Sequence, residues 1–230
     1  MINLNQRSSK TEILDKYDLP FEDVKICIKE LNVINTLLGG HKITQNGVDH
    51  FYTENNAYFS VCEIGCGGGD NLKAISKKYP NVTFTGIDLK SSCIDFARSQ
   101  YRELNAEWIA SDYSKVKFDT KPDIIFSSLF CHHFSNTQLI EMLIWMKQNS
   151  SKGFFINDLE RNTIAYYLIK WLTALFSRSY MVKNDGPISV ARSFTKKDWQ
   201  LLFAKAGIIN YTIKWKWAFR YLVIYKNGTA

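Results

Sequence analysis

The chain has 230 residues, of which 46% are hydrophobic and 22% are charged. This length and balance are typical of one folded domain with a sizeable core. The sequence has no run of about 18 apolar residues, so a membrane-spanning helix is not expected. The first residues lack the apolar segment of a secretory signal, and the five cysteines include no C-x-x-C pair. We therefore expect reduced thiols, a cytoplasmic location and no metal site.

The net charge of +7 is unevenly distributed along the chain. Residues 161–230 hold 12 Lys and Arg and two acidic side chains, whereas residues 1–160 hold 17 basic and 20 acidic ones. A basic final third could contact an acidic carrier protein, a membrane surface or another anionic partner. It could equally be a solvated face.

The hydrophobic pattern predicts helices first and then an alternation of strands and helices. Residues 1–20 are polar and are expected to form an arm or a frayed helix, and helical spacing over 21–40 ends at Gly39-Gly40, with His41 in the next loop. Strands are predicted at 59–64, 82–87, 107–110, 123–127 and 153–157. Helices are expected near 70–79, 91–103 and 136–149. This alternation indicates a doubly wound, mostly parallel α/β sheet.

The end of the chain departs from this alternation. Thr195, with Asp198 three residues later, has the pattern of a capping box and predicts a helix over 195–206. The β-rich runs 208–217 and 219–226 follow closely enough to pair as an antiparallel hairpin.

An insert, residues 159–193, separates the fifth strand from this last helix. Its segment 164–176 is apolar nearly all round but is too short to cross a bilayer. Three interpretations are open for it: a buried helix, a lid over an apolar pocket, or a helix that lies on a membrane or a partner.

A glycine-rich turn, Val61-Cys-Glu-Ile-Gly-Cys-Gly-Gly-Gly-Asp70, directly follows the first strand. Glycine tolerates positive φ and lets backbone amides approach a ligand, and the next helix offers free N–H groups. Asp88 ends the second strand, where a carboxylate can accept both hydroxyls of a ribose. Asp112, after the third strand, can accept a proton from an exocyclic amine. The position that a dinucleotide fingerprint gives to its last glycine is Asp70, which disfavours a nicotinamide cofactor.

Taken together, these features resemble the class I S-adenosylmethionine-dependent methyltransferases from about residue 61 to 226. The resemblance rests on the glycine turn, Asp88, the Asp112-Tyr113 pair, the strand that starts at Asp123 and the terminal hairpin. It implies a seven-stranded Rossmann-like sheet and S-adenosylmethionine as the cofactor. The residues that it implies for cofactor binding are Glu63, Gly65, Cys66, Gly67, Gly69, Asp88, Leu89, Asp112, Tyr113, Ser127 and Ser128.

The methyl acceptor is expected beyond the carboxyl ends of the strands. His132 and His133 follow the fourth strand and are candidate general bases, because an imidazole with a pKa of about 6.5 can remove a proton from a phenol or an acid. The sequence does not choose between them, and many methyltransferases need no base. The residues expected to orient the substrate are His41, Asn157, Asp158, Arg161, Tyr166 and Tyr167.

The insert resembles the helices of small-molecule methyltransferases that act on polyketide, quinone or similar acceptors. The leading hypothesis is therefore O-methylation of a hydrophobic small molecule. The alternatives are an RNA-modifying methyltransferase that uses the basic final third, and a non-catalytic module that binds the cofactor or a carrier protein. Nucleic acid is the less expected partner, because apolar residues interrupt the basic charges. We expect one domain, made of a helical N-terminal part (1–58), a cofactor-binding half (59–158), the insert (159–193) and a last helix with its hairpin (194–230).

Overall fold

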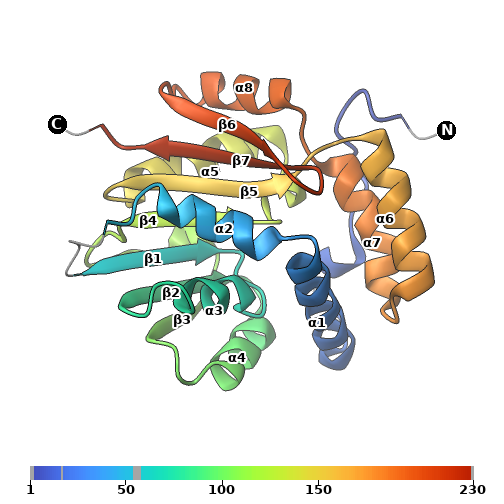
Figure 1. Ribbon diagram of the computed structural model, residues 1–230, viewed down its shortest axis with the longest axis horizontal. Helices are drawn as coiled ribbons and strands as arrows, with labels where there is room; N and C mark the ends of the chain where they lie inside the picture. The colour runs from blue at the N-terminus through green and yellow to red at the C-terminus, as the bar shows by residue number, and fades with distance from the viewer. Residues whose placement is uncertain (1–2, 17, 54–57, 229–230) are drawn as a thin grey trace.

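The computed structural model describes residues 3–16, 18–53 and 58–228, and a seven-stranded sheet forms its centre (Figure 1). The strand order is β3-β2-β1-β4-β5-β7-β6, and β7 runs antiparallel to both of its neighbours. The strands are β1 (Phe59–Ile64), β2 (Val82–Asp88), β3 (Ala106–Ala110), β4 (Ile124–Ser128), β5 (Gly153–Leu159), β6 (Tyr211–Lys216) and β7 (Arg220–Lys226). The predicted parallel α/β sheet with an antiparallel terminal hairpin is confirmed.

Two layers of helices cover the sheet because its central strands are apolar on both faces. Phe126 and Phe155 point to one face, where their rings stack at 4.8 Å, whereas Ile125 and Phe154 point to the other. The first face is covered by α2 (Gly40–Asp49), α3 (Asp70–Ser76) and α4 (Ser91–Gln100). The second face is covered by α5 (Asn136–Asn149) and α8 (Lys196–Lys205). The capping box of α8 at Thr195 is present as predicted.

A third group of helices stands beyond the carboxyl ends of the parallel strands (Figure 1). It consists of α1 (Phe21–Leu37), α6 (Thr163–Phe176) and α7 (Tyr180–Arg192), and with residues 3–16 we call it the cap layer. Residues 3–16 are folded into this layer, because the backbone N–H groups of Ile13 and Leu14 donate to the Asp185 carboxylate at 2.8 and 2.9 Å. The sequence predicted an arm or a frayed helix here; the segment has one short 3-10 turn, Ile13–Asp15, and is held against α7.

The connection between α1 and α2 also differs from the prediction. Gly39 adopts a left-handed conformation (φ 73°) that ends α1, but α2 begins at the very next residue. His41 therefore lies in the first turn of α2 and not in a loop.

Helix α6 is not buried, so the first of the three interpretations of this segment is wrong. Of its apolar side chains, Leu168 and Leu172 contribute to the wall of a cavity, while Trp171 and Phe176 are 64% and 77% exposed. The helix therefore has an inner face that lines a cavity and an outer apolar face in contact with solvent. None of the helices in the described part of the chain is long and apolar enough to cross a membrane.

The close contact of α2 with the sheet supplies a test of the packing. A Cβ atom at Gly47 would lie 2.5 Å from the ring of Phe155, so we expect Gly47→Ala to lower the free energy of unfolding by about 1–3 kcal/mol, although alanine is the better helix former. Gly186→Ala in α7 is the control, since its nearest neighbours would lie at 3.2 and 3.5 Å. Urea denaturation measures both variants. Equal stabilities for Gly47→Ala and the wild type would contradict the described packing of α2.

Candidate active site

The glycine turn between β1 and α3 has a conformation that requires its alternate glycines. Gly65, Gly67 and Gly69 have φ values of 69°, 50° and 82°, and a Cβ at Gly65 would lie 2.2 Å from the ring of Phe130. The turn is tied to the neighbouring strand, since the backbone N–H groups of Gly65 and Cys66 donate to the carbonyl of Ile87. The N–H groups of Gly67 and Gly69 donate to Asp88 and to the carbonyl of Cys66, which fixes the shape of the turn at the N-terminus of α3.

Two buried acids support this turn. The Asp88 carboxylate, at the end of β2, accepts hydrogen bonds from the backbone N–H groups of Gly67 and Lys90, both at 2.9 Å. Burial raises the pKa of Asp88 in spite of these bonds. Glu63 lies beneath the turn, where its Oε1 accepts from Asn71 at 2.7 Å, and burial raises its pKa well above the usual range.

A cavity of about 670 Å³ opens beside the glycine turn. Of the residues predicted to bind a cofactor, its lining includes Gly65, Cys66, Gly67, Asp88, Leu89 and Ser128. Residues that the sequence did not indicate also line it, among them Thr11, Asp15, Asn32 and Asn35. These come from residues 3–16 and α1, which carry no motif, so only the folded chain brings them here.

Several residues predicted to bind the cofactor lie outside the lining of this cavity. Asp112 accepts from the backbone N–H of Ser114 at 3.0 Å and caps a short turn, and the ring of Tyr113 packs edge-on against Trp145. Ser127 is buried beside the thiol of Cys131. Gly69 lies behind the turn, where its Cα faces Trp108.

A second cavity, of about 360 Å³, adjoins the first. The two cavities share four lining residues: Leu14, Leu31, Leu129 and His133. The second cavity is mainly apolar and lies between α1, α6, α7 and the β6–β7 turn. Its charged or titratable lining residues are Glu12, Cys27, His132, His133, Asp185 and Arg220.

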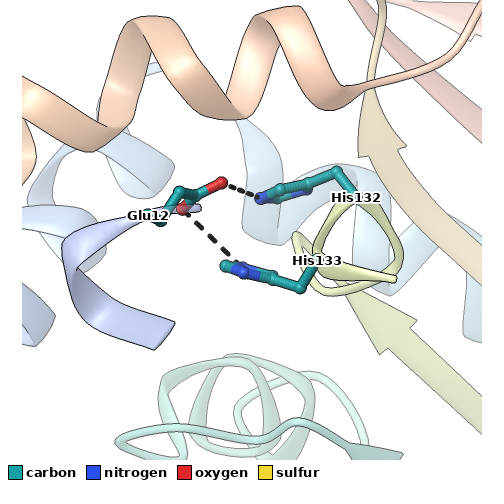
Figure 2. A group of neighbouring side chains, drawn as sticks. All are labelled: Glu12, His132 and His133. Atoms are coloured by element: carbon teal, nitrogen blue, oxygen red, sulfur yellow. Dashed lines mark ion pairs between the residues drawn. The ribbon is translucent and has the colours of Figure 1, made fainter. Parts of the chain in front are cut away.

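The two histidines after β4 converge with Glu12 at the boundary of the cavities (Figure 2). Each Nδ1 is held by a carboxylate: His132 by Asp158 at 2.7 Å, and His133 by Asp15 at 2.6 Å. Each Nε2 faces the Glu12 carboxylate, at 3.7 and 3.9 Å. A carboxylate accepts from Nδ1–H, so whenever a ring is neutral its Nε2 atom is an acceptor that points toward Glu12.

The charges around this cluster set the protonation of its acids. Burial raises the pKa of Glu12 to about 7. Burial also acts to raise the pKa of Asp15, but the hydrogen bond and charge of His133 prevail and lower it to about 2. Arg192 donates to Asp15 at 2.9 Å and to the carbonyl groups of both histidines.

Three acceptor atoms that face one another require a proton or a cation between them. A proton on Glu12 meets this need at neutral pH. A divalent metal ion could do so as well, because the ligand atoms of Glu12, His132 and His133 all lie within 4.8 Å of one another. Asp15 and Asp158 would then orient the histidines as outer partners.

The residues predicted to bind the substrate are dispersed. Asp158 holds His132, but Asn157 is buried under α2, where it donates to the carbonyl of Gly40, and Arg161 pairs with Asp198 at 2.9 Å. His41 is hydrogen-bonded to Asn71 and Asn32, behind the wall of the first cavity. Tyr166 lines a separate depression with residues 3 and 6–10. The Tyr167 ring packs edge-on against the Tyr166 ring.

The comparisons with known proteins agree with this architecture. Residues 61–152 match the sequence model of the family described as methyltransferase domain. The chain also has the fold of the plantazolicin methyltransferase BpumL in complex with SAH, with a TM-score of 0.69 at 19% identity over 89% of this chain and 90% of that one. Residues 61–152 thus match a methyltransferase domain, and the chain has the fold of a methyltransferase.

Curated relatives of this methyltransferase domain include O-methyltransferases. The malonyl-[acyl-carrier protein] O-methyltransferase of Acetivibrio thermocellus is 23% identical over 95 residues, which are 41% of this chain and 34% of that protein. The fatty-acid O-methyltransferase of Mycolicibacterium smegmatis is 31% identical over 61 residues, which are 26% of this chain and 22% of that protein. The chain thus spans about a third or less of these relatives.

The position of Asp88 predicts a defect in cofactor binding. Asp88→Ala removes the acceptor that holds the glycine turn and the cavity wall together, so we expect S-adenosylhomocysteine to bind at least about tenfold more weakly in isothermal titration calorimetry. Asp119→Ala, at an exposed position, is the matched control. Unchanged affinity in Asp88→Ala would show that the ribose does not lie there.

The raised pKa of Glu12 predicts a pH-dependent stability difference. Glu12 binds its proton more tightly in the folded chain, with a pKa of about 7 against 4.5 for the unfolded one, so its stabilising effect is complete below pH 4.5 and is lost as the pH rises through 7. Glu12→Gln stays neutral. We expect urea denaturation, with a chelator present, to give the same free energy of unfolding for wild type and variant at low pH. At about pH 8 the free energy of unfolding of the wild type should be lower by about 3 kcal/mol. Parallel pH profiles would contradict the assignment.

Proposed function

We propose that the chain is an S-adenosylmethionine-dependent methyltransferase that methylates an oxygen atom of a lipophilic small molecule. The observation that supports this most directly is the pair of adjoining cavities. One has the glycine turn and Asp88 in its wall, the other is apolar, and His133 belongs to both. In this proposal the methionine part of the cofactor lies at the turn, its ribose is bound by Asp88, and the acceptor enters the second cavity.

The chemistry of the transfer makes modest demands on the protein. The sulfonium already activates the methyl group, so alignment of the acceptor oxygen with the methyl carbon and the sulfur is the main requirement. The oxygen forms a bond to the methyl carbon as the carbon–sulfur bond breaks, and S-adenosylhomocysteine is the leaving group. An acceptor that carries a proton releases it to a base.

His133 is the proposed base. Its imidazole lies on the boundary of the two cavities, and the bond from Nδ1 to Asp15 leaves Nε2 free to accept a proton. His132 is more deeply buried and lines only the second cavity, so we assign it a positioning role through its contact with Asp158 and Glu12.

The relatives support an acceptor with an acyl or similar apolar body. Two of them are named as O-methyltransferases of malonyl-[acyl-carrier protein] and of fatty acids, and a lipophilic acceptor suits the leucine-rich second cavity. We further propose that the acceptor arrives on the outer face of α6, from an acidic carrier protein or a membrane surface. Lys170 and Arg178 accompany the exposed apolar side chains there.

The proposed base can be tested by mutation. His133→Ala is expected to lower kcat by roughly 10²- to 10⁴-fold while S-adenosylhomocysteine binds within about threefold of the wild type. Formation of S-adenosylhomocysteine, with decanoic acid and an alkylphenol as acceptors, measures the rate. His50→Ala is the control, because His50 lines neither cavity.

The two acceptors separate the role of His133 from that of the fold. An alkylphenol carries a proton at neutral pH, so the rate of its methylation should depend strongly on His133. A carboxylate is already ionised, so the rate of its methylation should depend less on His133. An equal loss with both acceptors would contradict a role as base.

A further inference from the structure

Arg220 is a buried cation without a counter-ion. It is the first residue of β7, its side chain is 2% exposed, and burial lowers its pKa to about 10. Its Nε and Nη1 atoms have no hydrogen-bond partner, and none of the side chains in the described part of the chain forms an ion pair with it. A charge in this state costs several kcal/mol unless something neutralises it.

The surroundings of Arg220 do not supply that compensation. The side chain lies under the first turn of α2, where a Cβ at Gly40 would be 2.9 Å from Nη1. A helix N-terminus carries a partial positive charge, so it opposes the guanidinium. Asn35 Oδ1, beside the same glycine, is also unpaired, but a neutral amide cannot neutralise a full charge. Asp158 attracts Arg220 from a distance, but its carboxylate is bonded to His132.

The local backbone holds Arg220 at the wall of the second cavity. The residues before it, Ala218 and Phe219, have φ values of 59° and 56°, a left-handed conformation that is unfavourable for a residue with a side chain. The carbonyl of Phe219 accepts from the backbone N–H of Glu160 at 2.7 Å, which fixes the turn against the end of β5. Trp217, Ala218, Phe219 and Arg220 all line the second cavity. The turn thus presents one cation in a mainly apolar chamber.

We propose that Arg220 binds the delocalised oxyanion of an acidic acceptor, a carboxylate or the enolate of a dicarbonyl compound, whose apolar body fills the second cavity. This inference rests on the proposed function and narrows its substrate to lipophilic oxygen acids, of which a carboxylate arrives ionised and an enol loses its proton to His133. A planar guanidinium pairs with two oxygens of such a group at once, which neutralises the charge and fixes the orientation of the acceptor. Arg220 is a specificity-determining residue in this role, and the oxygen that takes the methyl group lies nearer to His133.

Calorimetric titration of the full chain with matched ligands tests the inference. Three probes are used, each in the presence of S-adenosylhomocysteine. Decanoic acid represents a carboxylate, a long-chain cyclic diketone represents an enolate, and decanamide is the neutral control. We expect the wild type to bind at least one acidic probe at least about tenfold more tightly than the amide, and Arg220→Met to lose this preference. Arg102→Met, at an exposed position away from both cavities, should retain it. Whichever acidic probe shows the preference identifies the source of the oxyanion.

Two further measurements keep the outcome unambiguous. Arg220→Met should melt at the same or a higher temperature than the ligand-free wild type, since it removes an uncompensated buried charge, whereas an arginine needed only for packing would lower the melting temperature. Arg220→Lys keeps the charge but not the two-pronged geometry and should show an intermediate preference. Equal binding of acids and amide by the wild type would overturn the inference. Failure of S-adenosylhomocysteine to bind at all would instead overturn the proposed function.

Discussion

The site depends on the contact between the N-terminal segment and the turn after β4. Asp15 accepts from His133 and from Arg192, and Glu12 faces both histidines, so residues from the two ends of the sequence meet across the carboxyl edge of the sheet. Asp185 of α7 holds the same segment through its backbone. Leu14, between these contacts, is part of the wall of both cavities. Without this segment the sheet would remain, but the cavities would have no common boundary.

The distribution of buried polar atoms without hydrogen-bond partners points to the same region. Within the described ranges, three ionisable side chains have such atoms: Glu12, Glu63 and Arg220. Glu12 and Arg220 line the second cavity, and Glu63 lies beneath the turn that borders the first. Elsewhere the buried ions are paired, as Arg161 is with Asp198 and Asp158 with His132. Since buried polar groups without hydrogen-bond partners are costly, their concentration at the cavities favours a site that its ligands complete.

The fold was predictable because it rests on local patterns. Period-2 and helical spacing identified the strands of the parallel sheet, and the glycine turn with Asp88 identified one cavity wall. The helix ends were less predictable: α4 ends at Gln100, where the Tyr101 hydroxyl bonds to Asp70 of α3, a contact between residues far apart in the sequence. The roles of Glu12 and Arg220 could not be predicted from the sequence for the same reason. Each role depends on which residues from distant parts of the chain surround the side chain, and only the fold determines that. Asn157 and Arg161 are of residue types that are common in binding sites. In the fold both are buried, and their side chains bind other parts of the protein: Asn157 the carbonyl of Gly40, and Arg161 the carboxylate of Asp198.

Helix α6 shows why its apolar pattern was ambiguous in the sequence. Ala165, Leu168, Ile169 and Leu172 line the second cavity, while Trp171, Leu175 and Phe176 are exposed to solvent, as Leu168 and Leu172 are in part. A single helix therefore separates an apolar chamber from an apolar surface. Its inner face packs closely on Gly186 of α7 through Ile169 and Thr173, and Asn162 caps its first turn. If the acceptor arrives from the outer surface, as we propose, this one helix is the part of the wall that it has to pass, which gives the exposed apolar side chains a role that packing in the core does not.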